Sequence, residues 1–235
     1  MGDAGLSAVR EKKEYEAIQN LKYLQELGVE LINENFEKES RTVAISLRNI
    51  GSKAALNKLE ETSKVALKLL RELSEKAFEK KYADTLFSLA RALQEIGKSS
   101  AKAGLKLPSK QAVEGLEEIG LKAVEHKMEV LTLWSTLALG EIAYEAGKKE
   151  LKAPQARAKA AREAIIKAAE AKAFVTRAQI ELYPQLICDT VKSFGDYPAL
   201  APAGYEPTSE KTPKANEEFT EEEFFKGESE NKAKE

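Results

Sequence analysis

The stretch LRNIGSKA at residues 47–54 recurs, with changes, at intervals of 23 residues. The other copies are LQELGVEL (24–31), LRELSEKA (70–77), LQEIGKSS (93–100), LEEIGLKA (116–123) and LGEIAYEA (139–146). Six leucines therefore stand in one unbroken column, which chance does not explain in a chain of this composition. A repeated unit of 23 residues decides the fold.

Each unit predicts one amphipathic helix followed by a short turn. Ala44, Leu47, Ile50 and Ala54 share one face at 3.6 residues per turn, so they form the buried stripe of such a helix. Ala, Leu, Glu and Lys dominate the repeats, and no stretch alternates apolar and polar residues as a strand does. The sequence therefore predicts an all-α fold with about seven or eight antiparallel helices.

A column of small residues follows the second apolar column: Gly28, Gly51, Ser74, Gly97, Gly120 and Ala143. Glycine inside a helix costs about 1 kcal/mol relative to alanine, so several glycines need a compensating gain. Close approach of neighbouring helices is the gain that we expect here. The alternative is ancestry alone, in which every copy kept the glycine of one original unit.

The breaks between units carry residues that often start helices. Ser40, Ser63 and Ser109 occupy equivalent positions and are predicted to cap the first free N–H groups. Pro108 and Pro154 lie 46 residues apart, where new helices are expected to begin. The resulting helices are 63–81, 86–104, 109–127 and 132–150. Two units then make a 46-residue hairpin, with an inner apolar member and an outer charged one.

A stack of 46-residue helical hairpins resembles α-solenoids of the HEAT or armadillo type, whose repeats run to about 40–47 residues. The resemblance covers roughly residues 12–181 and concerns period and architecture, because the Pro, Asp and basic positions of a HEAT hairpin are not matched in register. It implies a surface that binds other macromolecules. A closed helical bundle built from duplicated helices is the alternative that the spacing leaves open.

The chain changes character near its C-terminus. We expect a helical repeat domain over residues 1–195, followed by a Pro-rich and then acidic disordered tail over 196–235. Residues 201–235 contain ten Glu and five Lys. Within the tail, Phe219, Phe224 and Phe225 lie among glutamates and form a candidate binding motif that could fold into a short helix on a partner.

Composition argues against several classes of protein. One Cys and one His exclude a disulfide framework and the usual structural zinc sites. No 18-residue apolar run or secretory leader is present, so a cytoplasmic location is expected. His126 falls on a mostly polar face, Cys188 lies in the short stretch LICD, and no nucleotide-binding or hydrolase motif occurs. We therefore expect a non-enzymatic protein with no cofactor, metal or small-molecule substrate.

Two groups of residues are candidates for partner binding. The first is Phe87, Leu133, Trp134 and Leu137, which form an apolar cluster on the predicted inner helices. They either enlarge the core or line an exposed groove for a partner helix or for the tail.

The second group is the set of basic residues Lys152, Arg157, Lys159, Arg162 and Lys167, on a segment with few acidic residues. It either solubilises the last helix, holds the acidic tail, or binds nucleic acid or an anionic membrane. The sequence favours a scaffold that binds a protein partner, with self-association open and polyanion binding as the alternative function.

Overall fold

The computed structural model describes residues 2–183, which form eight full helices and a ninth helical segment at 177–183. The helices are α1 (Gly2–Arg10), α2 (Glu14–Asn33), α3 (Glu37–Leu56), α4 (Glu60–Lys80), α5 (Ala83–Lys102), α6 (Lys106–Glu125), α7 (Glu129–Lys148) and α8 (Lys152–Ala171). No strand occurs within residues 2–183, so the all-α prediction is confirmed. The predicted boundary at 195 and the tail lie outside the described residues.

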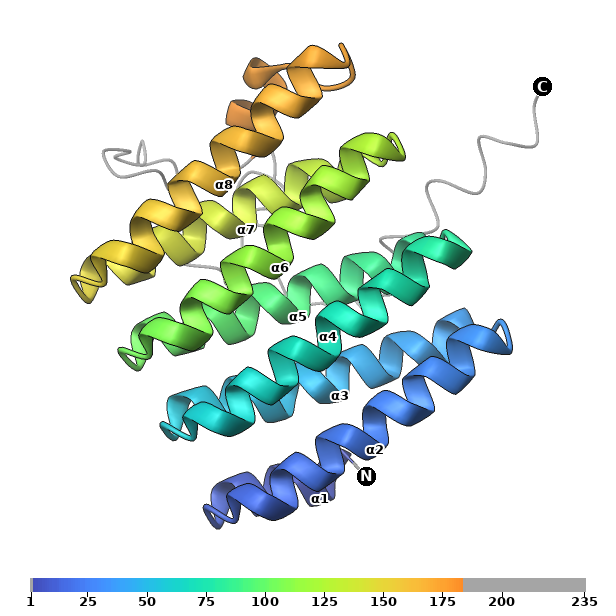
Figure 1. Ribbon diagram of the computed structural model, residues 1–235, viewed down its shortest axis with the longest axis vertical. Coiled ribbons are helices and arrows are strands. Elements are labelled where there is room, and N and C mark those ends of the chain that lie inside the picture. The colour runs from blue at the N-terminus through green and yellow to red at the C-terminus, as the bar shows by residue number, and fades with distance from the viewer. Residues whose placement is uncertain (1, 184–235) are drawn as a thin grey trace, which may run out of the picture. The chain divides into compact units, whose positions relative to one another are not determined.

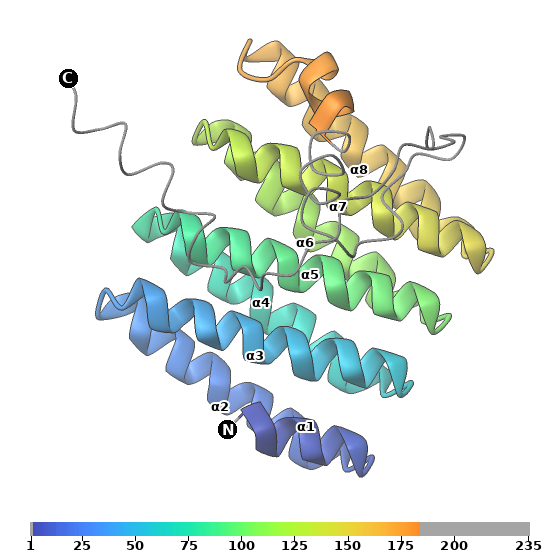
Figure 2. The same cartoon turned by 180° about the vertical axis from the view of Figure 1, so that it is seen from behind.

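The helices are arranged in two layers. The odd-numbered helices α1, α3, α5 and α7 lie side by side in one layer, and the even-numbered helices α2, α4, α6 and α8 lie in the other (Figures 1 and 2). Among these eight helices, every packing contact joins helices that are one or two places apart in chain order. The described helices therefore form an open repeat array, and the closed-bundle alternative is wrong for them.

The leucine column lies at the centre of this array. Leu47, Leu70, Leu93, Leu116 and Leu139 have no exposed surface, and Leu24 is also buried. These side chains belong to one continuous apolar core that runs the length of the described helices. The periodic stack predicted from the repeat is thus confirmed at the residues on which the prediction depends.

Every helix ends in the same turn, which holds one residue with positive φ. These residues are Lys12, Asn35, Lys58, Lys81, Gly104, Lys127, Glu150 and Ala173, each 23 positions after the last. In the turn after α3, the Lys58 N–H donates to the Ala55 carbonyl and the Leu59 N–H to the Ala54 carbonyl, at 3.0 and 2.9 Å. This pair of bonds is the Schellman motif, which satisfies carbonyls left free at the helix end.

The predicted helix starts are wrong by three residues. The helices begin at Glu60 and Lys106, immediately after the apolar residues Leu59 and Leu105, and no N-cap side chain makes a capping bond. Ser63 and Ser109 lie in the first turn, buried, and their hydroxyls donate back to the Leu59 and Leu105 carbonyls at 3.0 and 2.7 Å. Both serines are fully buried, where a small side chain fits between closely packed helices.

Ser40 departs from the prediction in the same way. Its hydroxyl donates to the Glu37 carbonyl at 2.7 Å and lies 2.8 Å from the Thr85 hydroxyl of α5. Pro108 and Pro154 fall at the third position of α6 and α8, within the first turn, as their spacing indicated.

The small-residue column receives side chains from the helix two units further on. A Cβ placed on Gly51 would lie 2.5 Å from Ile96 Cδ1, and one on Gly97 would lie 2.6 Å from Ile142 Cδ1. Gly5 and Ile50 make the same match, as do Gly120 and Ile165, always 45 residues apart. The glycines therefore serve packing, which is the interpretation favoured from sequence.

Replacing one of these glycines tests this fit. Gly51→Ala is expected to lower the free energy of unfolding by about 1–3 kcal/mol, because the new methyl group overpacks the site against Ile96 and Ala66. Gly140→Ala is the matched control, since nothing lies within 4 Å of a Cβ there. That change should raise stability by up to about 1 kcal/mol. Urea denaturation of both variants measures the contrast, and equal effects would refute the packing role.

The recurring turn gives a second expectation. Lys58 has φ 61°, a conformation that costs a non-glycine residue about 1–2 kcal/mol. Lys58→Gly should therefore raise the free energy of unfolding by about 0.5–1 kcal/mol. This net gain allows for the larger conformational entropy that glycine loses on folding. Lys68→Gly, on the exposed face of α4, should instead lower it by about 1 kcal/mol. Thermal and urea unfolding that moved both variants in one direction would contradict this account.

Candidate functional site: an aromatic face and a cationic hollow

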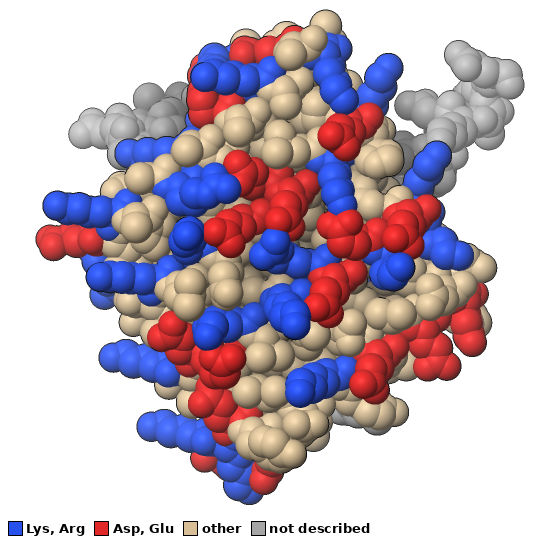
Figure 3. All heavy atoms as spheres, in the orientation of Figure 1, with Lys and Arg blue, Asp and Glu red and all other residues tan. Residues whose placement is uncertain are grey.

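The outer face of the even-numbered helices is a network of paired charges. Arg71 of α4 donates from Nε to Glu118 of α6 at 3.0 Å, and Arg157 of α8 bonds to Glu117 of α6. Lys122 and Glu75 make a further pair between α6 and α4. Figure 3 shows the acidic and basic side chains interleaved over these helices. These ion pairs link neighbouring helices of the layer, and their charged groups remain partly exposed to water.

The odd-numbered helices are much less charged. Helices α3, α5 and α7 carry 15 charged residues in 60, whereas α4, α6 and α8 carry 24 in 61. Binding surfaces are depleted of charge at their centres, because a charge is costly to desolvate. The outer surface of α3, α5 and α7, which we call the odd-helix face, is therefore the stronger candidate for partner binding.

An aromatic pair lies on the odd-helix face where α5 meets α7. The Phe87 and Trp134 rings are tilted by 54° with centroids 4.9 Å apart, and both side chains are half-buried. Leu133 and Leu137 of α7 are buried, at 7% and 8% exposure. Leu133 belongs to the main core, which favours the core interpretation for that residue. The four predicted residues thus divide into two buried leucines and two aromatic rings that retain some exposed surface.

Trp134 carries a polar group with unused bonding capacity. Its indole Nε1 is screened from water and has no hydrogen-bond acceptor in the described part of the chain. A buried donor without an acceptor costs about 1–3 kcal/mol. The Trp134 side chain also packs against the main core, so the core interpretation applies to it in part as well.

Beside the aromatic pair, polar contacts tie α5 to α7. Gln94 Nε2 and Lys98 Nζ of α5 lie 2.6 and 2.8 Å from Glu141 Oε2 of α7. Burial works to lower the pKa of Lys98, but the carboxylates of Glu141 and Glu95 outweigh it and raise the pKa. Glu141 therefore holds two neighbouring helices in register next to the candidate site.

The structure does not gather the predicted basic residues of α8 into one surface. Arg157 points to α6, where its hydrogen bond to Glu117 raises the pKa of the guanidinium. Its charge is therefore already paired in a contact between α8 and α6. Of the other predicted basic residues on this helix, Lys152, Lys159 and Lys167 are exposed and Arg162 is half-buried.

Nearby, Arg177 donates to Glu163 at 2.8 Å and lies 3.5 Å from Glu170, so acidic groups interrupt the lysines. Its hydrogen bond holds the pKa of Glu163 below the usual range.

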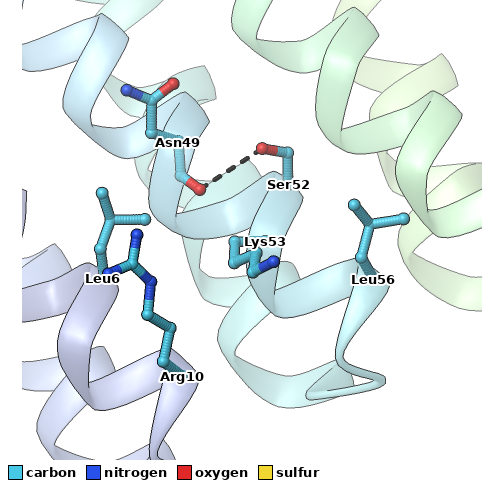
Figure 4. Close-up of a pocket in the computed structure, with 6 residues that line it drawn as sticks. All are labelled: Leu6, Arg10, Asn49, Ser52, Lys53 and Leu56. Atoms are coloured by element: carbon cyan, nitrogen blue, oxygen red, sulfur yellow. Dashed lines mark hydrogen bonds between the residues drawn. The ribbon is translucent and has the colours of Figure 1, made fainter.

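A hollow of about 240 Å³ lies between α1 and α3, and sequence reasoning missed it (Figure 4). Its lining consists of Leu6 and Arg10 from α1, and of Asn49, Ser52, Lys53 and Leu56 from α3. The hollow lies where the C-terminal half of α1 meets the last two turns of α3. The one available signal was the cation in the last turn of each helix, Arg10 and Lys53.

The hollow combines charge with apolar surface. Arg10 and Lys53 are exposed, Leu56 is 51% exposed and Leu6 is half-buried. The Ser52 hydroxyl donates to the Asn49 backbone carbonyl at 3.4 Å, and the Asn49 side-chain oxygen accepts from Arg48 Nε at 3.3 Å. Both cations also complement the dipoles of the helices that they end. The hollow can accept an anionic group together with an apolar one.

Other single residues proposed or excluded from sequence can now be placed. His126 ends α6 on the exposed surface, as expected, and stacks on Phe78 with centroids 5.6 Å apart. Residues 2–183 contain no group of three or more potential metal ligands, and none of their helices is long and apolar enough to cross a bilayer. Cys188 and the tail residues Phe219, Phe224 and Phe225 lie outside the described residues.

Comparison with known proteins gives no family for the chain. No protein-family model matches it, and no curated protein matches it.

The α5–α7 contact can be tested through Glu141. Glu141→Gln should lower the pKa of Lys98, measurable by NMR of the lysine side chain, and reduce the free energy of unfolding by about 1–2 kcal/mol at neutral pH. Because the pKa of Lys98 is raised, this contribution is present at neutral pH and disappears as pH rises through that raised value. Glu79→Gln, on an exposed pair with Lys76, should change stability by less than about 0.5 kcal/mol.

Proposed function

We propose that this protein is a non-enzymatic helical-repeat scaffold that binds a protein partner on the odd-helix face. The observation that carries the proposal is the Phe87–Trp134 pair, two half-buried rings on the less charged of the two layers. Aromatic anchors surrounded by little charge are typical of the energetic centre of protein interfaces.

The array explains how such a surface would grip a ligand. Helices of one layer are rigidly spaced, so α3, α5 and α7 present side chains at regular intervals to a helical or extended segment. A segment of another protein is the expected partner, and a second copy of this chain is the alternative within the same class.

We also infer that the array is a degenerate relative, in architecture, of HEAT or armadillo solenoids. The two-helix period of 46 residues supports this inference, since those repeats run to about 40–47 residues. Binding along one layer is the mode that such an architecture implies.

Binding of nucleic acid or an anionic membrane by α8 is the second candidate. The three exposed lysines Lys152, Lys159 and Lys167 support it. It is the weaker candidate because Arg157 and Arg177 already pair with carboxylates. Its physical signature is an affinity that falls steeply with salt, which an apolar aromatic site does not show.

Site-specific photocrosslinking in the native host distinguishes the two faces. A photoreactive amino acid at Thr42, exposed on α3, should give a discrete protein adduct, whereas one at Lys68, exposed on α4, should not. Phe87→Ala should reduce the Thr42 adduct at least fivefold, as expected for loss of an interface anchor of about 1 kcal/mol or more. Adducts of equal yield at both positions, or none at Thr42, would disprove binding on the odd-helix face.

A further inference from the structure

Helix α2 lies at the end of the even layer (Figure 1). Among the helices of residues 2–183, it packs within that layer against α4 alone. Leu73 of α4 packs on Gly28 of α2, since a Cβ on that glycine would lie 3.1 Å from Leu73 Cδ2. Ile165 of α8 packs on Gly120 of α6 in the same way. The face of α2 at the matching repeat positions has no described helix of its own layer against it.

This face of α2, which we call its leading face, is apolar. It consists of Tyr23, Leu27 and Leu31, which follow one another at four-residue intervals and therefore lie on one side of the helix. Tyr23 is 50% exposed, and Leu27 and Leu31 are half-buried. The residues at the same repeat positions of α4 and α8 are all buried: Leu69, Leu73, Ala77, Ala161, Ile165 and Ala169.

The leading face does not have the composition of a cap. Terminal units of repeat arrays carry a polar outer face, which keeps the array soluble. Helix α2 instead carries Tyr23 and Leu31 at the positions where α8 carries Ala161 and Ala169. These larger side chains add apolar surface where polar residues are expected. The leading face therefore has the character of a helix contact that lacks its second helix.

Glu26 extends a series of polar contacts between the even-numbered helices. Gln25 of α2 donates to Glu72 of α4 at 3.3 Å, and Arg71 of α4 donates to Glu118 of α6 at 3.0 Å. Glu26 lies 46 residues before Glu72, so it is the acceptor of the preceding pair in this series. It is exposed and has no donor among residues 2–183. Since α2 carries four Glu and one Lys, a basic partner complements it.

We propose that the leading face of α2 binds an amphipathic helix of another protein, which occupies the place of a further even-numbered helix. Such a helix needs a small residue opposite Leu27, as Gly28 lies opposite Leu73. It also needs an Arg or Lys three positions before that residue, to pair with Glu26. The leading face is separate from the odd-helix face, so this inference goes beyond the proposed function and does not depend on it.

A second copy of this chain fits the leading face less well. Two α2 helices paired about a twofold axis would bring two acidic helices together, each with four Glu and one Lys. Like charges that face each other across an interface oppose association. The charge of α2 therefore favours a basic helix of a different protein over self-association.

A synthetic helix tests the proposal with the full chain. The probe is a fluorescein-labelled peptide of residues 60–81, which carries Arg71 three positions before Ser74. A lactam bridge between Lys68 and Glu72, an i,i+4 pair, holds it helical. The fluorescence anisotropy should saturate at one peptide per protein chain. Tyr23→Ala should weaken the binding about fivefold, because an aromatic side chain at the centre of the contact is lost.

A charge swap tests the register of the contact. Glu26→Arg in the protein and Arg71→Glu in the peptide should each weaken binding about fivefold, because each change places like charges opposite each other. The two changes together should restore binding to within about twofold, as expected for a direct pair. Glu125→Arg, an equal change on an exposed residue of α6, should have no effect, because α6 does not contact α2.

Three results would overturn the proposal. The first is the absence of saturable binding by the peptide once circular dichroism has shown it to be helical. The second is a charge swap that does not restore binding. The third is a protein dimer, detected by sedimentation velocity, that Tyr23→Ala dissociates, because the leading face would then bind a second copy of the chain.

Discussion

The insertion of one isoleucine into the space above one glycine is the contact on which this structure depends. Ile96 fills the position that a side chain on Gly51 would take, and Ile142 does so at Gly97. Since the partners are always 45 residues apart, each contact joins two helices of the same layer and sets the step between them. A larger residue would push the helices apart, while a missing methyl group would leave a void, so neighbouring units are held at one spacing. Repetition of this step produces an open array.

The two layers differ in the charge that they carry. In the even layer, ion pairs such as Arg71–Glu118 and Arg157–Glu117 cross from helix to helix, so its charges are used within the molecule. The odd layer has fewer charges, but ion pairs also cross between its helices, as between Arg41 and Asp84 and between Lys98 and Glu141. The hydrogen bond between Gln94 and Glu141 adds to the second of these contacts. The less charged layer carries the partly exposed rings of Phe87 and Trp134.

The parts of the fold that repeat could be predicted from sequence, because a column of identical residues averages out local exceptions. The leucine column and the glycine contacts are of this kind. Helix starts could not, since Ser63 resembles a cap but acts as a small buried residue that bonds to the Leu59 carbonyl. The turns were hidden because glycine, which would have marked the positive-φ position, occupies it in only one of the eight turns, whereas lysine does so in four. Of the candidate site, the proximity of Phe87 and Trp134 was predicted, but the hollow was not, because it depends on how the ends of α1 and α3 pack rather than on a sequence motif.

Departures from the repeat are therefore the most informative positions for function. Stacking alone accounts for any residue type that recurs every 23 positions, so it says nothing about what the surface binds. Trp134 breaks a column whose other members are Gln19, Thr42, Val65, Ser88 and Gln111, and no packing rule of the array requires a tryptophan there. The Trp134 ring contacts Phe87 and packs against the main core, while its buried Nε1 lacks an acceptor among the described residues, so this departure is one that the periodicity of the array does not explain.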